Sequence, residues 1–207
     1  MSVRVVTRAD VDRIAESLAL AFEDDPVMGF LFPNPASRVR RLKRFFRAGL
    51  VVQHLPHGAC FTDAESSGAA LWDPPGHWRI TFAQLLRGAP HMLAALGARV
   101  PAGLRALSAV ERAHPATPHY YLAVLGTRPD RQGKGVASSV LRPILERCDA
   151  DGVGAYLESS KESNIAFYRR HGFETTGEIQ LPGGPVVWPM WREPRRAADT
   201  QRDGMKL

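Results

Sequence analysis

The chain has 207 residues, of which 44% are hydrophobic and 23% charged, a balance typical of one folded globular domain that excludes a disordered chain. The net charge of +6 is compatible with an anionic ligand or a nucleic acid and does not choose between them. Cys60 and Cys148 are too few for a disulfide framework, so we expect a cytoplasmic protein. We find no signal-peptide pattern, and no apolar run approaches the roughly 20 residues that a membrane span needs.

The first half of the chain predicts a short strand, three helical regions and a hairpin. A strand over 3–6 precedes a helix whose apolar residues Val11, Ile14, Leu18 and Phe22 share one face. Residues 23–35 are expected to form a loop, because prolines interrupt them. A helix follows from about 36 to 52, and we interpret its basic stretch as a solvated face. The runs 58–63 and 68–73 predict a hairpin, and residues 79–113 predict two or three inserted helices.

The second half alternates strands with helices. A strand over 119–127 runs into a glycine-rich turn, and a helix over 133–149 and a strand over 154–159 follow. A short helix over 163–171 leads to a last hairpin around Pro182, Gly183 and Gly184. This order predicts a single α/β domain with a mixed sheet, spanning residues 1–192. Residues 193–207 lack apolar content, so we predict a flexible tail.

The turn "GTRPDRQGKGVASSVL", residues 126–141, is the most informative segment. Backbone N–H groups at the start of a helix form a ready site for phosphate, and the helix dipole adds positive charge there. The P-loop pattern G-x-x-x-x-G-K-[ST] fails, because Arg128 stands at its first glycine and Gly135 at its hydroxyl. The dinucleotide pattern G-x-G-x-x-G also fails, since Ser138 stands at its third glycine.

What remains is a strand, the segment "RPDRQGKGVA" and a helix, in which Gln132, Gly135 and Ala137 fit the pattern Q/R-x-x-G-x-G/A. The strand "YLES" and the segment "NIAFYRRHGF" follow downstream. On these motifs the sequence resembles the GNAT superfamily of acyl-CoA N-acyltransferases, most specifically over residues 119–192. Within it, "PDRQGKGVASSVL", "FYRRHGF" and the Pro-Gly-Gly-Pro hairpin look closest to the puromycin N-acetyltransferase-like group.

The resemblance implies a fold and a co-substrate. The fold would be a mixed, mostly antiparallel central sheet with splayed middle strands, flanked by helices, with extra helices inserted at about 79–113. The co-substrate would be acetyl-CoA, with no metal. Its pyrophosphate would lie against the amides of the glycine turn, and its pantetheine arm along the end of strand 119–127, where one N–H would also stabilise the oxyanion. Gly126 would lack a side chain because of that close approach. The implied cofactor residues are Leu125, Gly126, Thr127, Gln132, Gly133, Lys134, Gly135, Val136, Ala137, Ser138, Asn164 and Tyr168.

Two residues carry the implied chemistry. Tyr168 matches the family's general acid, which protonates the leaving thiolate, although it also fits a core position on an apolar helix. Glu158, at the end of a strand, is the candidate base, acting directly or through water; its alternative role is a carboxylate paired with Arg or Lys. Asp24 and Asp25 would bind a cationic amine or only solvate a loop, and His119 would face the acceptor or serve the structure.

We therefore expect an acetyl-CoA-dependent N-acetyltransferase that acts on a primary amine of a small molecule by direct attack in a ternary complex. The amine would belong to an aminonucleoside-type antibiotic or to another xenobiotic or metabolite. Three alternatives stay open: a catalytically silent acyl-CoA-binding domain, a protein N-terminal or lysine acetyltransferase, and a basic nucleic-acid-binding module based on "RVRRLKRFFR". We expect neither nucleic acid nor membrane as a partner, and a monomer or a homodimer.

Overall fold

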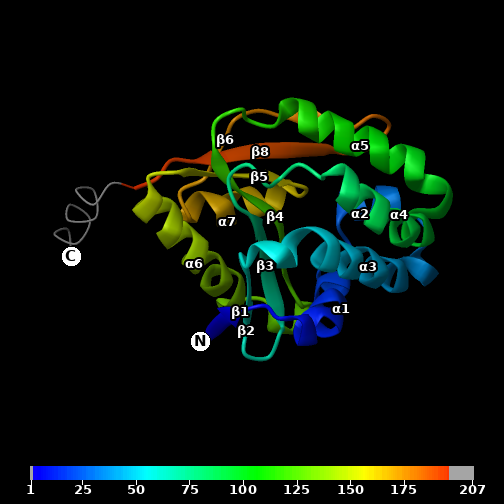
Figure 1. Ribbon diagram of the computed structural model, residues 1–207, viewed down its shortest axis with the longest axis horizontal. Coiled ribbons are helices and arrows are strands. Elements are labelled where there is room, and N and C mark those ends of the chain that lie inside the picture. Colours follow the sequence, from blue (N-terminus) through cyan, green and yellow to red (C-terminus); the bar gives the residue numbers. More distant parts are fainter. Residues whose placement is uncertain (1, 196–207) are drawn as a thin grey trace.

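The computed structural model describes residues 2–195 and centres on one mixed sheet (Figure 1). The strands follow the order β1-β2-β3-β4-β5-β8-β6, and β7 pairs with the remaining part of β8. Only β4 and β5 run parallel, and every other described pair is antiparallel. The strands are β1 (Val3–Val5), β2 (Cys60–Asp63), β3 (Gly68–Asp73), β4 (His119–Thr127), β5 (Gly154–Ser159), β6 (Glu174–Thr175), β7 (Ile179–Gln180) and β8 (Val186–Arg192).

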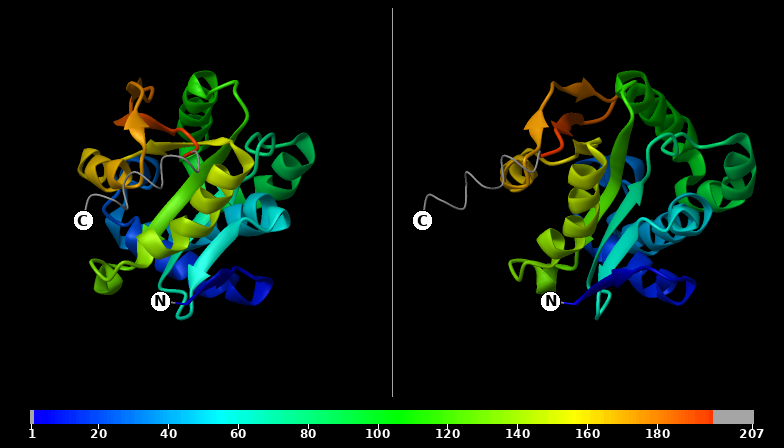
Figure 2. Two further views of the ribbon diagram at one scale, coloured as in Figure 1. Left: turned by 90° about the vertical axis from the view of Figure 1, so that its left-hand side faces the viewer. Right: turned by 60° about the vertical axis from the view of Figure 1, so that its left-hand side comes forward.

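Helices cover both faces of the sheet, as Figure 2 shows from two further sides. They are α1 (Val11–Ala21), α2 (Pro26–Leu31), α3 (Pro35–Gly49), α4 (Phe82–Leu96), α5 (Val100–Ala113), α6 (Val136–Asp151) and α7 (Ile165–Arg170). Helices α6 and α7 pack on one face, and α1 and α3 on the other. This confirms the predicted α/β fold, with a mixed and mostly antiparallel sheet flanked by helices.

The alternation of side chains along β2 and β3 explains the two faces. Phe61, Ala70 and Trp72 point into the core under α6, while Cys60 and Leu71 point into the core under α1 and α3. Successive residues of a strand face opposite sides, so a strand buried on both faces is apolar throughout. All of β2 and β3 is buried, which makes these strands the middle layer of the domain.

Three helix boundaries differ from the sequence expectation. The expected loop 23–35 contains α2, because Pro26 occupies the first helical turn and the Asp25 side chain accepts a hydrogen bond from the Met28 N–H. The expected helix 36–52 ends at Gly49 and continues as a π-helical turn over Leu50–His54. The helix expected from 133 begins at Val136, because Gly133 and Gly135 have positive φ angles.

Residues 82–113 form two helices between β3 and β4, as predicted. Taken together they span 32 residues and contain an 18-residue window with a mean hydropathy of 1.2, which by length and composition is enough to cross a membrane. The expectation that no apolar run approaches that length is therefore corrected. Gly97, with φ of +54°, separates α4 from α5, and each helix alone is shorter than a membrane span.

The predicted tail, residues 193–207, falls almost entirely outside the described residues, which end at 195. The domain boundary at 192 therefore stays a prediction.

Candidate functional site

A gap opens between β4 and β5 in the middle of the sheet. The two strands pair only from His119 to Tyr121 on β4 and from Gly154 to Tyr156 on β5. Beyond that point β4 stays paired with β3, and β5 stays paired with β8. No strand in residues 2–195 pairs with the other edge of β4 from Leu122 onward, so its backbone groups face the gap. These splayed strands were predicted from the family resemblance.

A β-bulge sits on β4 where the gap opens. Leu71 of β3 is paired with Val124 and Trp72 with Leu122, which leaves Ala123 as an extra residue. A bulge bends its strand and leaves backbone groups out of the ladder. It therefore leaves backbone groups around Ala123 out of the ladder with β3, a feature that the sequence analysis missed.

The predicted pantetheine segment, Leu125 to Thr127, lies along this free edge. A ligand lying along β4 as an added strand would find open backbone groups on this edge. The segment therefore fits the pantetheine arm of the implied co-substrate.

Gly126 lacks a side chain for a different reason from the one expected. A Cβ atom there would lie 2.8 Å from Leu18 Cδ2 and 2.9 Å from Phe22 Cε2, both on the α1 side of the sheet. Side chains leave a sheet perpendicular to its plane, whereas an added strand lies within that plane. Gly126 therefore makes room for α1 and not for the pantetheine arm.

Replacing Gly126 with alanine should destabilise the fold by about 1–3 kcal/mol, because the added methyl group overpacks the contact with Leu18 and Phe22. Urea denaturation measures the change. Gly29→Ala is the control, since no atom lies within 4 Å of the Cβ position in helix α2 and alanine favours helix. If Gly126→Ala is as stable as the unmodified chain, the packing argument is wrong.

The glycine turn forms an open cradle at the start of α6. Gly133 and Gly135 have φ angles of +73° and +79°, and no atom lies within 4 Å of either Cβ position. No side chain caps α6, so the N–H groups of Val136, Ala137 and Ser138 point out of the helix end. Such an end, with its partial positive charge, suits a phosphate.

The charged and polar side chains of the turn mostly bind one another. Arg128 lies 3.1 Å from Asp130, and Arg131 pairs with Glu65. Gln132 donates a hydrogen bond to the Thr127 carbonyl at 3.2 Å, which ties the turn to the end of β4. Lys134 bonds only the carbonyl oxygen of Asp130 and, among residues 2–195, has no acidic partner. Lys134 is therefore the cation of the turn that is left for a ligand.

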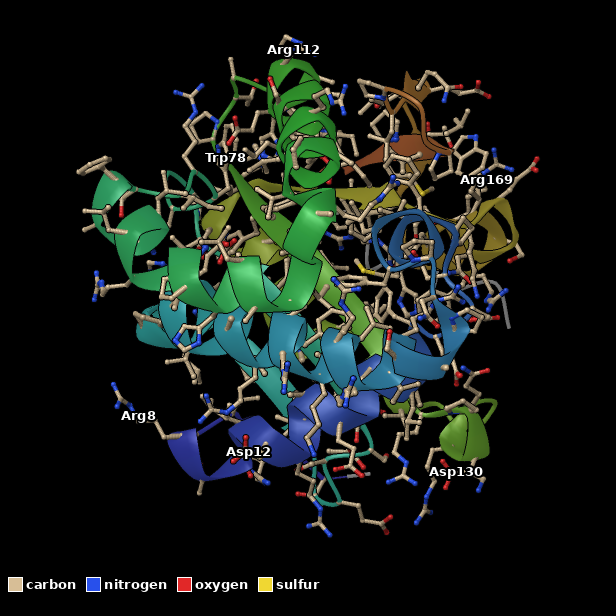
Figure 3. All side chains as sticks on the ribbon, turned by 90° about the vertical axis from the view of Figure 1, so that its right-hand side faces the viewer. Arg8, Asp12, Trp78, Arg112, Asp130 and Arg169 are labelled. Atoms are coloured by element: carbon tan, nitrogen blue, oxygen red, sulfur yellow. The ribbon has the colours of Figure 1, made fainter. Side chains whose placement is uncertain are left out.

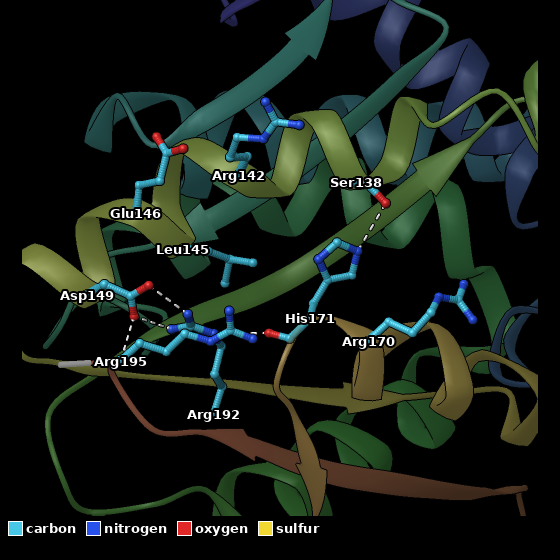
Figure 4. Close-up of a pocket in the computed structure, with 9 residues that line it drawn as sticks. All are labelled: Ser138, Arg142, Leu145, Glu146, Asp149, Arg170, His171, Arg192 and Arg195. Carbon is cyan, nitrogen blue, oxygen red and sulfur yellow. Dashed lines mark hydrogen bonds and ion pairs between the residues drawn. The ribbon is translucent and has the colours of Figure 1, made fainter. Parts of the chain in front are cut away.

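A cavity of about 210 Å³ lies along α6 from Ser138 to Asp149, between α6, α7 and the end of β8 (Figure 4). Ser138 and His171 meet in its wall, with Ser138 Oγ 3.0 Å from His171 Nε2. Burial lowers the pKa of His171, and the neighbouring Arg170 adds to that effect. Arg142 also lines this basic cavity. Of the lining residues only Ser138 was expected, because the others belong to none of the motifs.

Asp149 and Arg192 form a bidentate ion pair, with both distances 2.8 Å, at the edge of the same cavity. The Arg192 side chain is buried, and the pair ties α6 to β8. The wall of the cavity is therefore fixed by a charged link between elements far apart in the chain.

Tyr168, the predicted acid, is buried in the core under α6 and α7. Burial raises the pKa of its hydroxyl, and the Asp25 carboxylate raises it further. Tyr168 thus occupies a core position and also keeps its proton at neutral pH. The core position of Tyr168 is confirmed, and its role as general acid stays a prediction.

The predicted acceptor carboxylates already have partners. Asp25 caps α2 and also accepts a hydrogen bond from the Ser160 hydroxyl just beyond β5. Burial raises the pKa of Asp25. Asp24 lies 2.6 Å from the Lys161 ammonium. The acidic loop is therefore tied to the end of β5, beside Tyr168, and its role toward an amine stays a prediction.

Glu158 lies on β5 beyond the point where β4 and β5 separate, and its side chain is only 8% exposed. Its Oε2 accepts a hydrogen bond of 2.8 Å from the Tyr121 hydroxyl, and its Oε1 lies 3.6 Å from His114 Nδ1. No Arg or Lys pairs with Glu158 in the described region. The Glu158 carboxylate therefore faces Tyr121 and His114, and not the Arg or Lys of the alternative interpretation.

His119 lies close to the groups around Glu158, whereas Asn164 does not contact them. The ring of His119 is buried, and its Nε2 lies 2.8 Å from His114 Nε2. Asn164 is exposed before α7, and its side chain makes no hydrogen bond to the described residues. The sequence analysis missed His114 and Tyr121, since neither belongs to a motif.

Comparisons with known proteins agree with this geometry. Residues 58–173 match the family model described as Acetyltransferase (GNAT) family. The chain is 27% identical to an uncharacterized N-acetyltransferase of Schizosaccharomyces pombe, over 98% of this chain and 87% of that relative. A solved structure from Corynebacterium glutamicum, described as histone acetyltransferase HPA2 and related acetyltransferase, has a TM-score of 0.72 and 27% identity and covers 94% of this chain and 96% of that one. The polyamine N-acetyltransferase of Drosophila melanogaster shares the fold, with a TM-score of 0.62, 17% identity and coverage of 93% and 99%.

Proposed function

This chain belongs to the acetyltransferase (GNAT) family, and from that premise we propose that it acetylates a primary amine of a small molecule by direct attack in a ternary complex. Its activity is that of an acetyl-CoA-dependent N-acetyltransferase. The observation that carries the proposal is the gap between β4 and β5, which ends at an open glycine turn.

We propose one continuous site for acetyl-CoA. The free edge of β4 from Leu125 to Thr127 would bind the pantetheine arm through backbone hydrogen bonds. The N–H groups of Val136 to Ser138 would bind the pyrophosphate, with Lys134 nearby. The cavity with Arg142 and Arg170 would hold the phosphorylated adenosine end, since it continues from Ser138 and is basic.

The direct attack is supported by the state of the two cysteines. Both are free and buried, and burial raises the pKa of each thiol to about 12. A thiol with that pKa is almost entirely protonated at neutral pH, and the thiolate is the nucleophile. An acetyl-cysteine intermediate is therefore disfavoured, and the amine would attack the thioester itself.

The roles that we propose follow from positions around the gap. An N–H of the bulged strand β4 would stabilise the oxyanion as the amine attacks. Tyr168, whose raised pKa keeps it protonated, would protonate the leaving thiolate. Glu158 lies where β4 and β5 begin to separate, and it would take the proton from the acceptor ammonium.

For the acceptor we propose small alkyl amines first. The structural neighbour from Drosophila is described as forming N-acetylagmatine. We include aminonucleosides because the sequence resembles the puromycin N-acetyltransferase-like group. Purified protein with acetyl-CoA should therefore turn over members of a panel of alkyl amines and aminonucleosides. Turnover of a histone-type peptide alone would favour a protein acetyltransferase, and binding of acetyl-CoA without any turnover would favour a silent domain.

Glu158→Gln should reduce activity on an alkyl amine about tenfold more than activity on an aryl amine at neutral pH. An alkyl ammonium, with a lysine-like pKa of about 10.4, must lose a proton, whereas a weakly basic aryl amine arrives neutral. The activity of the unmodified enzyme on alkyl amines should rise with pH, and the substitution should flatten this acidic limb. The affinity for acetyl-CoA should stay unchanged.

The exposed residue Glu162 supplies the control, since Glu162→Gln removes a nearby carboxylate outside the network. Rates at several pH values with both amine classes measure the effect. If Glu158→Gln lowers activity on both classes equally, or on neither, Glu158 is not the base.

A further inference from the structure

A chain of buried polar groups crosses the end of the gap where the acceptor would bind. The Thr117 carbonyl oxygen lies 2.6 Å from His119 Nδ1, and His119 Nε2 lies 2.8 Å from His114 Nε2. His114 Nδ1 then faces Glu158 Oε1 at 3.6 Å. The side chains of His114 and Glu158 are 1% and 8% exposed. The chain therefore ends on the carboxylate that we propose as the base.

Counting donors fixes the tautomers of both histidines. A carbonyl oxygen only accepts, so His119 Nδ1 must carry the hydrogen that it donates to Thr117. Burial lowers the pKa of His119, which makes its ring neutral and its Nε2 an acceptor. His114 Nε2 must then be the donor in the bond between the two rings. A neutral His114 consequently has a bare lone pair on Nδ1.

That lone pair faces the only unpaired oxygen of Glu158. The Tyr121 hydroxyl keeps its proton, because burial and the Glu158 carboxylate raise its pKa, and it donates to Glu158 Oε2. His114 Nδ1 and Glu158 Oε1 are both buried and have no hydrogen-bond partner among residues 2–195. Two acceptors that face each other share no proton, and the further donor close to Glu158 is the Tyr156 hydroxyl, which is also buried and without a partner among residues 2–195. The pair is built to take up a single proton.

Aromatic rings enclose the imidazole of His114. The Trp78 ring stacks on the imidazole with centroids 3.6 Å apart, and the rings of Tyr121 and Tyr156 stand edge-on at 4.8 Å. The face of the Trp78 ring attracts a cation, which offsets part of the cost of charging a ring that is shielded from water. Four other titratable or charged groups lie nearby: His119, the Tyr156 hydroxyl, Asp73, which is paired with His54, and Arg79, which lies over Trp78.

We propose that His114 and Glu158 act as one proton acceptor, in which Glu158 receives the proton of the acceptor ammonium and His114 holds it. This inference rests on the proposed function. The N–H bond of the ammonium breaks, an N–H bond forms at His114 Nδ1 by way of Glu158 Oε1, and the amine keeps its electron pair for the thioester. Glu158 touches the substrate, and His114 is a positioning residue that acts through it.

The location of the network separates it from the cofactor end. Trp78, which covers His114, and Asp130, in the glycine turn, lie far apart in Figure 3. A substitution at His114 should therefore leave acetyl-CoA binding unchanged.

His114→Gln tests the proposal, because glutamine can still donate a hydrogen bond to His119 but does not take up a proton. At neutral pH, kcat for an alkyl amine should fall about tenfold, while kcat for an aryl amine and the KM for acetyl-CoA should not change. The acidic limb of the alkyl-amine profile should flatten. His54→Gln is the control, since His54 is also buried and bonded to a carboxylate but lies outside the network. Equal losses on both amines, or an equal change of the pH profile in His54→Gln, would overturn the proposal.

Nitrogen-15 NMR of the histidine rings tests the proton arrangement without any turnover. His119 should carry its hydrogen on Nδ1 at all pH values, and His114 should carry one on Nε2 and gain the second on Nδ1 as pH falls. Glu158→Gln should move that uptake to lower pH. A hydrogen on His119 Nε2, or an uptake by His114 that Glu158→Gln leaves in place, would refute the pair. Failure of the unmodified enzyme to acetylate any amine would instead refute the proposed function.

Discussion

Gly135→Glu is expected to weaken acetyl-CoA binding by about 100-fold or more. The residue precedes the first turn of α6, where the N–H groups of Val136 to Ser138 are open. A glutamate side chain would fill the cradle and place a negative charge beside the pyrophosphate. Like charges brought together in a binding site cost several kcal/mol, and about 1.4 kcal/mol corresponds to a factor of ten. Titration calorimetry with coenzyme A measures the loss.

Gly152→Glu is the matched control for the backbone. Gly152 follows the other end of the same helix with φ of +65°, and no atom lies within 4 Å of its Cβ position. Both variants therefore carry a side chain on a left-handed backbone conformation, with similar strain. Only Gly135→Glu should lose affinity. If a folded Gly135→Glu protein binds coenzyme A as tightly as the control does, the phosphate site lies elsewhere.

Tyr168→Phe should lower kcat by about 100-fold and leave acetyl-CoA affinity nearly intact. Loss of a general acid typically costs 10²–10⁴-fold, and we expect about the lower end because an alkyl thiol, with a pKa of about 8.5, is a fair leaving group without help. The pKa of Tyr168 is raised, so the phenol stays protonated over the working range. The unmodified enzyme should therefore show no alkaline loss of activity from Tyr168 below about pH 10.

Tyr120→Phe separates the chemistry from the packing. Tyr120 belongs to the same buried cluster, and its hydroxyl lies 2.7 Å from Asp151. Both substitutions remove a hydroxyl from one core, so both can cost stability, but only Tyr168→Phe should lower kcat. Steady-state rates across pH, together with thermal unfolding of both variants, measure the difference. Full activity of Tyr168→Phe at every pH would remove Tyr168 from the mechanism.

The sequence by itself determined the order of the elements and the place of the phosphate turn. These features are local: apolar residues at strand or helix period mark the elements, and glycines mark positive φ angles. The hairpin of β2 and β3, the two helices of 82–113 and the turn before α6 were predicted on such signals and are present. The family resemblance added the splayed strands, which no local pattern of β4 shows.

Only the tertiary structure decided what surrounds the functional side chains. Pairing between β4 and β5 stops at Tyr121, whereas β3 stays paired with β4 as far as Thr127 and β8 stays paired with β5 as far as Ser159. Gly126 is required by α1, more than 100 residues earlier in sequence. Glu158 meets His114 and Tyr121 across the sheet. The protonation of a buried carboxylate depends on the groups that face it, and these come from distant segments that only folding brings together.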